Sequence, residues 1–454
     1  MTERADVVVV GLGVGGEEVA GRLAETGLSV VGIERSLVGG ECPYWGCVPS
    51  KMMIRAANLL AEARRIPGMA GAAEVRPDWA PVARRIRDEA TDSWDDRVAV
   101  ERFTGKGGRF VRGDARFVGP REVAVGDRTF QAKRGVVIAT GTAPAIPPIE
   151  GLAGTPLWTN HEAIEADTLP GSLVVLGGGA IGLELAQVFA RFGVEVTILE
   201  ALDRLLAVEE PEASELAAKA LARDGVSIRT GVSARAVEYG KEFTLQLEDG
   251  TSVTGDKLLV ATGRRAALGG LNLAAAGLDP DARSIAVDEL MRAGDRIWAV
   301  GDVTGRGAFT HVATYQATIA VRDILLQDGP PADYRALPRV TFTDPEIGAV
   351  GLTEAQAREQ GVPVRIGTAQ VASSARGWIH KAGNAGFIKL VADADQGILV
   401  GATSAGPVGG EVLSALAVAV QARVPIDTLR HMIYAYPTFH RGIEDALRDL
   451  ASTP

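Results

Sequence analysis

One pattern occurs twice in this chain of 454 residues and restricts its fold more than any other feature. An apolar run, Val7–Val10, precedes the glycine-rich turn Gly11–Gly16, a helical stretch and a second apolar run that ends at Glu34. The same order returns 166 residues later, from the turn Gly177–Gly182 to Glu200. Strand, glycine-rich turn, helix, strand and acid are typical of a nucleotide-binding α/β unit. The two copies predict an α/β protein with two Rossmann-like dinucleotide-binding domains.

Each residue type in this pattern has a physical role. Gly11 permits the tight turn, Gly13 lets the backbone approach a pyrophosphate, and Gly16 allows close packing of helix on strand. The acid that ends the second strand, Glu34, accepts a hydrogen bond from a ribose hydroxyl. The corresponding residues of the second copy are Gly177, Gly179, Gly182 and Glu200. The repeat therefore predicts two bound dinucleotides.

The only two cysteines, Cys42 and Cys47, are separated by four residues and follow the first copy of the pattern. Such a pair can open and close as a dithiol and a disulfide, and two cysteines in so long a chain are no structural disulfide framework. In a reducing cytosol a lone pair is more often catalytic than structural. The alternative is two buried thiols that lie close by chance, because cysteine packs like a small hydrophobe.

Composition and charge point away from several classes of partner. The formal net charge is −10, and basic clusters such as Arg84–Arg87 are followed by acids, so no nucleic-acid patch is expected. No apolar run approaches the roughly 20 residues of a membrane span. A strand starts so close to Met1 that no signal peptide is expected, and a cytoplasmic location is the default. No metal site is expected either, because the histidines outside the C-terminal segment do not cluster with acids or cysteines: His161, His311, His380 and His431.

Shorter motifs lie between and after the two copies. Short β runs at 109–112, 115–118 and 122–125 predict a meander that leads to a strand ending in Ala139-Thr140-Gly141. That ending recurs at Ala261-Thr262-Gly263 and lets backbone come close to a nucleotide. A later strand ends at Gly301-Asp302, where the acid can hold a sugar or ribityl hydroxyl or can serve as a helix N-cap.

Together these residues resemble the flavoprotein disulfide reductases, which include dihydrolipoamide dehydrogenase, glutathione reductase and mercuric reductase. The resemblance covers nearly the whole chain, including the run Cys42-x4-Cys47-Val48-Pro49-Ser50-Lys51 and the segment Thr343-Asp344-Pro345-Glu346. It implies FAD in the first copy, a nicotinamide nucleotide in the second, and a homodimer with a composite active site. The implied domains are an FAD-binding domain, 1–147, completed by about 266–335, an NAD(P)-binding domain, 148–265, and a C-terminal α+β dimerisation domain, 336–454.

The resemblance also assigns roles to single residues. Cys47 is the thiol next to the flavin and Cys42 the thiol that meets the substrate; a helix beginning at Cys47 would lower the pKa of its thiol. Lys51 stabilises negative charge on the reduced flavin, and Glu184 is its partner. FAD contacts are expected from Gly11, Gly13, Gly16, Glu34, Arg35, Gly40, Glu41, Lys51, Ala115, Thr140, Gly141, Asp302 and Ala313. Nucleotide contacts in the second copy are expected from Gly177, Gly179, Gly182, Glu200 and Gly263.

The acid of the second copy bears on which nicotinamide nucleotide binds. Glu200 can accept hydrogen bonds from a free 2′-hydroxyl and would repel a 2′-phosphate. NADH is therefore expected in preference to NADPH. Arg204 lies four residues further on and could still contact a phosphate, which leaves NADPH use open.

The segment Tyr436-Pro437-Thr438-Phe439-His440-Arg441 departs from the family pattern. Members that reduce organic disulfides carry His-Pro-Thr-x-x-Glu here, and the histidine–glutamate pair handles the proton of the substrate thiol. Tyr436 and Arg441 replace that pair, and a phenol is a poor base at pH 7 because its ordinary pKa is about 10. His440 is a candidate substitute base, or a surface histidine without a catalytic role. Mercuric reductases carry tyrosine here, but they also use a C-terminal cysteine pair that this chain lacks.

The expected function is electron transfer from NAD(P)H through FAD to the Cys42–Cys47 disulfide, and on to a disulfide, a metal ion or another small-molecule acceptor. One alternative is a transhydrogenase or quinone/diaphorase-type flavoenzyme that does not need the cysteines. Another is a redox-sensing flavoprotein whose disulfide switches a partner interaction.

Overall fold

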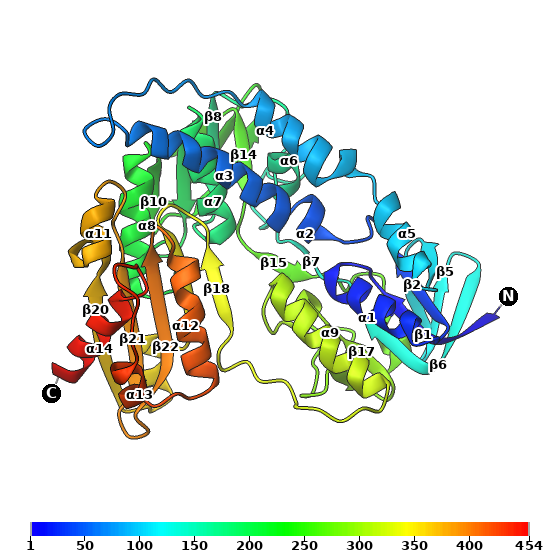
Figure 1. Ribbon diagram of the computed structural model, residues 1–454. Helices are drawn as coiled ribbons and strands as arrows, with labels where there is room; N and C mark the ends of the chain where they lie inside the picture. The colour runs from blue at the N-terminus through cyan, green and yellow to red at the C-terminus, as the bar shows by residue number, and fades with distance from the viewer. Residues whose placement is uncertain (1, 453–454) are drawn as a thin grey trace. The chain divides into compact units, whose positions relative to one another are not determined.

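The protein, seen in a computed structural model that describes residues 2–452, divides into two compact units (Figure 1). Of the described residues, the first unit comprises 2–50, 83–145 and 263–333, and the second comprises 51–82, 146–262 and 334–452. Parallel strands joined through helices occur in both units, which confirms the predicted α/β class. No helix within residues 2–452 combines the length and apolarity needed to cross a membrane.

The first unit is built on an eight-stranded sheet with the order β16-β17-β6-β1-β2-β3 along its main path. The strands of that path are β1 (Thr2–Val10), β2 (Val30–Glu34), β3 (Arg109–Arg112), β6 (Arg128–Ile138), β16 (Arg292–Gly294) and β17 (Ile297–Ala299). Successive residues of β1 point to opposite faces. Val7 and Val9 pack in one core with helices α1 (Val14–Glu25) and α9 (Thr310–Ile324), and Val8 and Val10 in another. The first glycine-rich turn thus follows the carboxyl end of a central strand whose last four residues, Val7–Val10, are buried.

The predicted meander is wrong at its first strand. β3 pairs in parallel with β2, from Val31 opposite Arg109 to Glu34 opposite Arg112, and extends the nucleotide-binding sheet. The antiparallel meander contains only β4 (Arg116–Gly119), β5 (Glu122–Val125) and β6. A short run of apolar and polar residues does not encode which strand it pairs with, and here the free edge of β2 provides the partner.

Between β2 and β3 the chain forms one longer helix, α3 (Cys47–Arg64), and several short helical segments. These include α2 (Glu41–Tyr44), α4 (Ala80–Arg85), the π-helical turn Ile86–Ala90 and α5 (Arg97–Gly105).

The second copy of the pattern forms a four-stranded parallel sheet of order β10-β9-β8-β14 in the second unit. Its strands are β8 (Ser172–Leu176), β9 (Glu195–Glu200), β10 (Ser227–Thr230) and β14 (Lys257–Val260). Helix α7 (Ala180–Arg191) follows β8 through the second glycine-rich turn, and α8 (Pro211–Arg223) follows β9. A separate antiparallel sheet is formed by β11 (Ala234–Tyr239), β12 (Phe243–Leu247) and β13 (Ser252–Gly255).

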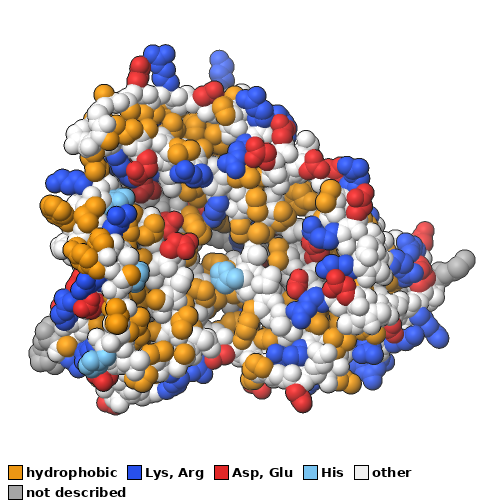
Figure 2. Space-filling model, in the orientation of Figure 1, with side chains coloured by type: hydrophobic (Ala, Val, Ile, Leu, Met, Phe, Trp, Pro, Cys, Tyr) orange, Lys and Arg blue, Asp and Glu red, His pale blue; other side chains and the backbone are white. Residues whose placement is uncertain are grey.

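The C-terminal part of the second unit is a five-stranded antiparallel sheet, with helices α12 (Gly409–Gln421) and α14 (Gly442–Ser452) contributing to its core (Figure 1). The strand order is β18 (Pro338–Thr341), β19 (Glu346–Gly351), β22 (Ile398–Gly406), β21 (Phe387–Asp393) and β20 (Val364–Gln370). Ile388 and Leu390 of β21 belong to this core, and Lys389 between them points to the opposite face. On the face of the molecule in Figure 2, acidic and basic side chains are interspersed.

Steric contact explains two glycines of each turn. Gly11 has φ +91°, and a side chain on it would place Cβ 2.4 Å from the Ala139 carbonyl oxygen. A Cβ on Gly16 would lie 1.9 Å from the Gly11 carbonyl oxygen. Gly177 and Gly182 repeat both contacts, at 2.4 Å from Ala261 O and 2.3 Å from Gly177 O. Glycine is thus required at these points by packing within the protein.

We expect Gly16→Ala to lower the free energy of unfolding by about 3 kcal/mol, because helix α1 must move off the turn to admit the methyl group. Gly105→Ala in the same unit is the matched control. Gly105 lies in helix α5, and no described atom comes within 4 Å of a Cβ built there. Chemical denaturation of both variants measures the difference, and equal midpoints for the two would contradict the steric account.

Candidate functional site

The glycine-rich turn of the first unit is closed by the carboxylate of Glu34. Glu34 Oε2 accepts the backbone N–H of Leu12 at 2.8 Å, and Oε1 accepts that of Ser36 at 2.7 Å. Gly13 is the N-cap residue of helix α1 and gives it no side-chain cap, and a Cβ on Gly13 would meet only Gly40 Cα, at 3.9 Å. Packing within the described chain thus does not demand glycine at this position. The turn leaves backbone N–H groups and space for a phosphate at the helix N-terminus.

The second unit repeats this arrangement bond for bond. Glu200 Oε2 accepts from Gly178 N at 2.5 Å, and Oε1 accepts from Leu202 N at 2.8 Å. These donors stand 166 residues after Leu12 and Ser36. Gly179 is the N-cap residue of helix α7, again without a side-chain cap, and no described atom lies within 4 Å of a Cβ built on that glycine. The sequence repeat therefore marks two sites with the same local chemistry. Gly263, another predicted nucleotide contact, follows β14 and has its backbone in the left-handed region, with φ +118°.

Several of the predicted flavin contacts belong to one hydrogen-bonded network in the first unit. Arg264 lies 3.3 Å from the Glu41 carboxylate and donates to the Thr142 hydroxyl at 2.8 Å. That hydroxyl donates in turn to Asp302 Oδ2 at 3.0 Å. Burial raises the pKa of the Asp302 carboxyl, against the opposing effect of the Thr142 hydrogen bond. The network fixes Glu41 and Asp302, which are far apart in the sequence, in one place.

The side-chain hydroxyl of Thr140 lacks a hydrogen-bond partner in the part of the chain that the structure describes. Its oxygen atom is buried. Leaving a buried polar group unsatisfied costs about 1–3 kcal/mol. An oxygen or nitrogen of a bound group beside Gly141 would satisfy it, so the residues present fit a polar cofactor such as FAD.

The other predicted flavin contacts lie on the same unit. Ala313 of α9 is buried, and its Cβ would lie 3.3 Å from a Cβ on Gly15 and 3.6 Å from one on Gly301. Gly40 has φ +69°, and a Cβ there would lie 2.8 Å from Gly13 Cα. Arg35 is exposed and 3.9 Å from Asp114, the neighbour of half-buried Ala115.

Three residues of this region were not predicted from the sequence: Arg264, Thr142 and Gln316. The side-chain oxygen of Gln316 accepts a hydrogen bond from Gly301 N at 2.7 Å. No local motif identifies them, because each acts through a partner distant in sequence.

Cys42 and Cys47 both lie in the first unit, and α3 begins at Cys47 as predicted. The Cys47 sulfur lies 3.4 Å from the hydroxyl of Thr310, the first residue of α9. A hydrogen bond to Cys47, together with burial, raises the pKa of the Cys42 thiol above its ordinary range. Both effects favour the protonated form of Cys42, whereas Cys47 stands at the N-terminus of helix α3.

Lys51 and Glu184 form an ion pair in the second unit. Lys51 Nζ donates to Glu184 Oε2 at 2.8 Å, and the other carboxylate oxygen accepts from Phe342 N at 2.8 Å. The ammonium also lies 4.7 Å from the centre of the Phe342 ring. Glu184 is 6% exposed, so its charge depends on these two donors. The structure thus brings together the lysine and glutamate that the resemblance paired.

The C-terminal segment that departs from the family pattern lies in the second unit, in the part that contains the five-stranded antiparallel sheet. Tyr436 is 66% exposed, and the Arg441 guanidinium lies 5.1 Å from the centre of its ring. Arg441 also pairs with Glu444 at 2.9 Å. His440 is half-buried beside the ring of Tyr434, with ring centres 6.3 Å apart. This chain therefore presents a phenol stacked with a guanidinium in place of an imidazole oriented by a carboxylate.

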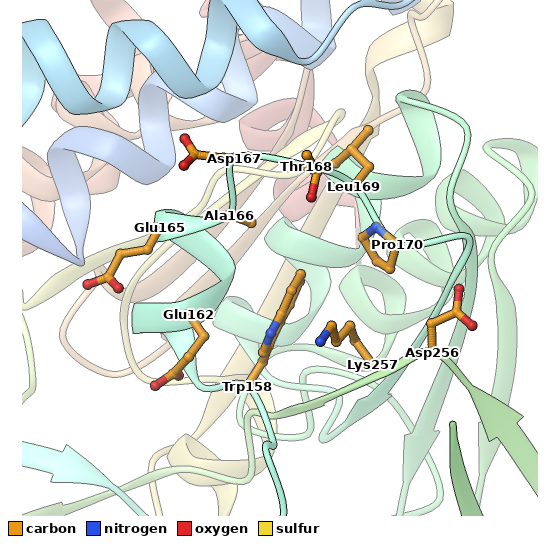
Figure 3. A pocket seen from close by; sticks show the side chains of 10 residues that line it. All are labelled: Trp158, Glu162, Glu165, Ala166, Asp167, Thr168, Leu169, Pro170, Asp256 and Lys257. Carbon is orange, nitrogen blue, oxygen red and sulfur yellow. The ribbon is translucent and has the colours of Figure 1, made fainter. Parts of the chain in front are cut away.

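A separate open cavity of about 480 Å³ lies in the second unit and is shown in Figure 3. It is lined by residues 158, 162, 165–170 and 256–257, with four carboxylates and one ammonium among them. Two of the acids already bind backbone: Glu162 accepts from Thr159 N at 2.7 Å, and Asp256 from Gly171 N at 2.8 Å. The predicted nucleotide contacts Gly177–Gly182 and Glu200 lie elsewhere in the unit.

Comparison with known proteins identifies relatives along the whole chain. Residues 5–317 match the family described as pyridine nucleotide-disulphide oxidoreductase, and residues 337–447 match its dimerisation domain. A mercuric reductase of Acidithiobacillus ferrooxidans is 35% identical over 452 residues, covering 96% of this chain and 81% of that protein. A dihydrolipoyl dehydrogenase of Thermus scotoductus is 33% identical over 463 residues, covering 98% and 97%. The Cu(II) complex of the HOCl-induced flavoprotein disulfide reductase RclA of Escherichia coli has a TM-score of 0.87 at 28% identity, covering 98% of this chain and 99% of that one.

These matches include both glycine-rich turns, the cysteine pair and the C-terminal sheet. The resemblance that the motifs indicated is confirmed over the full architecture. The chain belongs to the pyridine nucleotide-disulphide oxidoreductase family, enzymes that use FAD and NAD(P)H and carry a C-terminal dimerisation domain.

Proposed function

We propose that the protein oxidises NADH, and passes the electrons through FAD to a Cys42–Cys47 disulfide and on to a small, thiol-binding acceptor. The observation that carries the proposal is the hydrogen-bonded pair of Cys42 in α2 and Cys47 at the start of α3, in the unit whose Thr140, Glu41 and Asp302 fit FAD. The protein would work as a homodimer through its dimerisation domain, with Tyr436 contributed to the active site of the partner subunit.

FAD, when bound, supplies two-electron chemistry between a nicotinamide and a disulfide. The residues of this chain bind it and manage charge. Glu34 would accept from its ribose, and the N-terminus of α1 would receive its phosphates. Glu184 holds the Lys51 ammonium in place. We place the negative charge of the reduced pair on Cys47, because its sulfur lies at the N-terminus of α3, beside the Thr310 hydroxyl.

The electrons and protons of the proposed cycle balance. The hydride of NADH brings two electrons and one proton, which break the Cys42–Cys47 S–S bond and leave one thiol and one thiolate. Reduction of one Hg(II) by two electrons, or of two Cu(II) by one electron each, restores the disulfide and releases one proton. No base is needed to activate an organic thiol in this sequence of steps.

The departure at Tyr436 and Arg441 favours a soft metal ion as the acceptor. Disulfide exchange requires acid–base help at the substrate thiol, and the residues that provide it in the family are replaced here. A metal ion that binds thiolates has no such requirement. The mercuric reductase relatives and the Cu(II) complex of RclA are consistent with this class of acceptor. The NADH preference rests on Glu200, whose carboxylate would repel a 2′-phosphate.

Glu34→Gln is expected to weaken FAD retention by at least about tenfold, because one backbone N–H would face an amide nitrogen and a charged hydrogen bond is worth about 1.5–3 kcal/mol. The ratio of flavin to protein absorbance after dialysis measures the loss. Glu200→Gln makes the same change in the second copy, so it should keep the flavin and weaken NADH binding. Equal flavin loss in both variants would contradict the assignment of the two sites.

Cys42→Ser should abolish NADH-dependent reduction of Hg(II), Cu(II) and organic disulfides, yet leave quinone reduction at its original rate, since quinones take electrons from the flavin directly. Assays of NADH oxidation against these acceptors check this. Undiminished metal-ion reduction would mean that the cysteines are dispensable and would favour the diaphorase-type alternative. A wild-type protein that turned over none of them would favour the redox-sensing alternative.

His440→Gln should change kcat/KM by no more than about twofold, the effect of roughly 0.5 kcal/mol, because His440 packs beside Tyr434 and no acid–base step is assigned to it. The dependence of kcat/KM on pH for the metal-ion acceptor should also be unchanged. Loss of one limb of that pH profile in the variant would instead identify His440 as the substitute base.

A further inference from the structure

The loop of residues 201–210, which we call the ribose loop, connects Glu200 at the end of β9 to helix α8. It carries one arginine, Arg204, four residues after the ribose-binding acid. A guanidinium at this distance can act in two ways. It can extend into the nucleotide site and bind a 2′-phosphate, or it can turn inward and hold the loop.

Arg204 turns inward. Its Nη1 donates to the Leu206 carbonyl at 3.2 Å and to the Ser214 hydroxyl at 2.7 Å, and its Nη2 donates to the Ala207 carbonyl at 2.6 Å. Ser214 is 4% exposed and donates its own proton to Leu205 O. Both terminal nitrogens of the guanidinium are thus engaged with the turn 205–207 and with α8.

The turn held by Arg204 supports the glycine-rich turn. Leu206, with φ +45°, donates its backbone N–H to Gly178 O at 2.9 Å. A Cβ on Gly178 would lie 2.6 Å from Leu205 Cδ2, so the leucine packs directly against that glycine. Gly178 N is in turn the donor to Glu200 Oε2. A chain of contacts therefore runs from Arg204 through Leu206 and Gly178 to the ribose-binding carboxylate.

The far end of the ribose loop is fixed by two cations of the C-terminal sheet. Glu209 pairs with Arg339 through two bonds, Nε to Oε1 at 2.7 Å and Nη2 to Oε2 at 2.9 Å. Glu210, 2% exposed, lies 3.0 Å from Lys389 Nζ and accepts from Glu354 N at 2.7 Å. Burial alone would lower the pKa of Lys389, but hydrogen bonds to Glu212, Glu210 and Glu354 outweigh it and raise that pKa. Lys389 stays charged, and the loop is held at both ends.

We propose that Arg204 is a positioning residue for the nicotinamide nucleotide: it fixes the turn that supports Gly178 and Glu200, and it does not bind a 2′-phosphate. The ribose site then presents a carboxylate with no cation from this loop to offset it, which selects a nucleotide with a free 2′-hydroxyl. This inference rests on the proposed function, in which NADH is the electron donor.

Arg204→Met is the decisive variant, made in the full-length, flavin-loaded protein. We expect the Kd for NAD⁺, measured by calorimetry, and the KM for NADH to rise about tenfold, equivalent to about 1.4 kcal/mol. kcat and the ratio of NADPH to NADH use should stay within about twofold of the wild type, a change of roughly 0.5 kcal/mol. Ser214→Ala should shift Kd in the same direction by less, and Arg204→Lys should recover part of the loss.

Arg223→Met is the matched control, because it removes the same charge from the exposed end of α8. Its Kd for NAD⁺ should equal that of the wild type. Selective loss of NADP⁺ binding in Arg204→Met would overturn the inference, since it would make Arg204 a phosphate ligand. So would an unchanged Kd for NAD⁺, or the same loss in Arg223→Met. A wild-type protein that bound neither nucleotide would instead overturn the proposed function.

Discussion

Both nucleotide-binding units of the protein depend on the same contact. A carboxylate at the end of one strand accepts two backbone N–H groups, and one of these comes from the glycine-rich turn that follows the neighbouring strand. Glu34 does this for Leu12 and Ser36, and Glu200 does it for Gly178 and Leu202. The contact requires two parallel strands side by side, a turn without side chains that would clash, and a helix that starts where the turn ends. Those requirements define the nucleotide-binding unit.

The features that could be predicted from the sequence are those that short-range patterns encode. Turn glycines, strand-end acids, the helix start at Cys47 and the α/β class each follow from spacing along a few tens of residues. Strand β3 was misplaced because a four-residue run carries no information about which edge it joins. The Glu41–Arg264–Thr142–Asp302 network and the inward turn of Arg204 were missed for a related reason. A long polar side chain can reach many partners, and only the folded chain decides which one it meets.

The cysteine pair follows the family pattern, whereas the C-terminal segment, which would meet the acceptor under the proposed function, departs from it. The two sulfurs have different surroundings: burial and a hydrogen bond to Cys47 raise the pKa of the Cys42 thiol, whereas Cys47 begins helix α3. At the other end, Arg441 stacks on Tyr436 and pairs with Glu444, so the residue that would orient a histidine in the family now holds a phenol. Under the proposed function, this replacement favours an acceptor that binds sulfur and needs no proton delivered to it.

The central claim, that the dithiol pair stores the electrons of NADH beside the flavin, is tested most directly by anaerobic titration of the flavin-loaded protein with NADH. The account predicts that the first equivalent produces the long-wavelength absorbance of a thiolate in contact with oxidised flavin, and that two thiols become titratable at the same point. Loss of the oxidised flavin spectrum from the first addition, without the long-wavelength band and without new thiols, would contradict it.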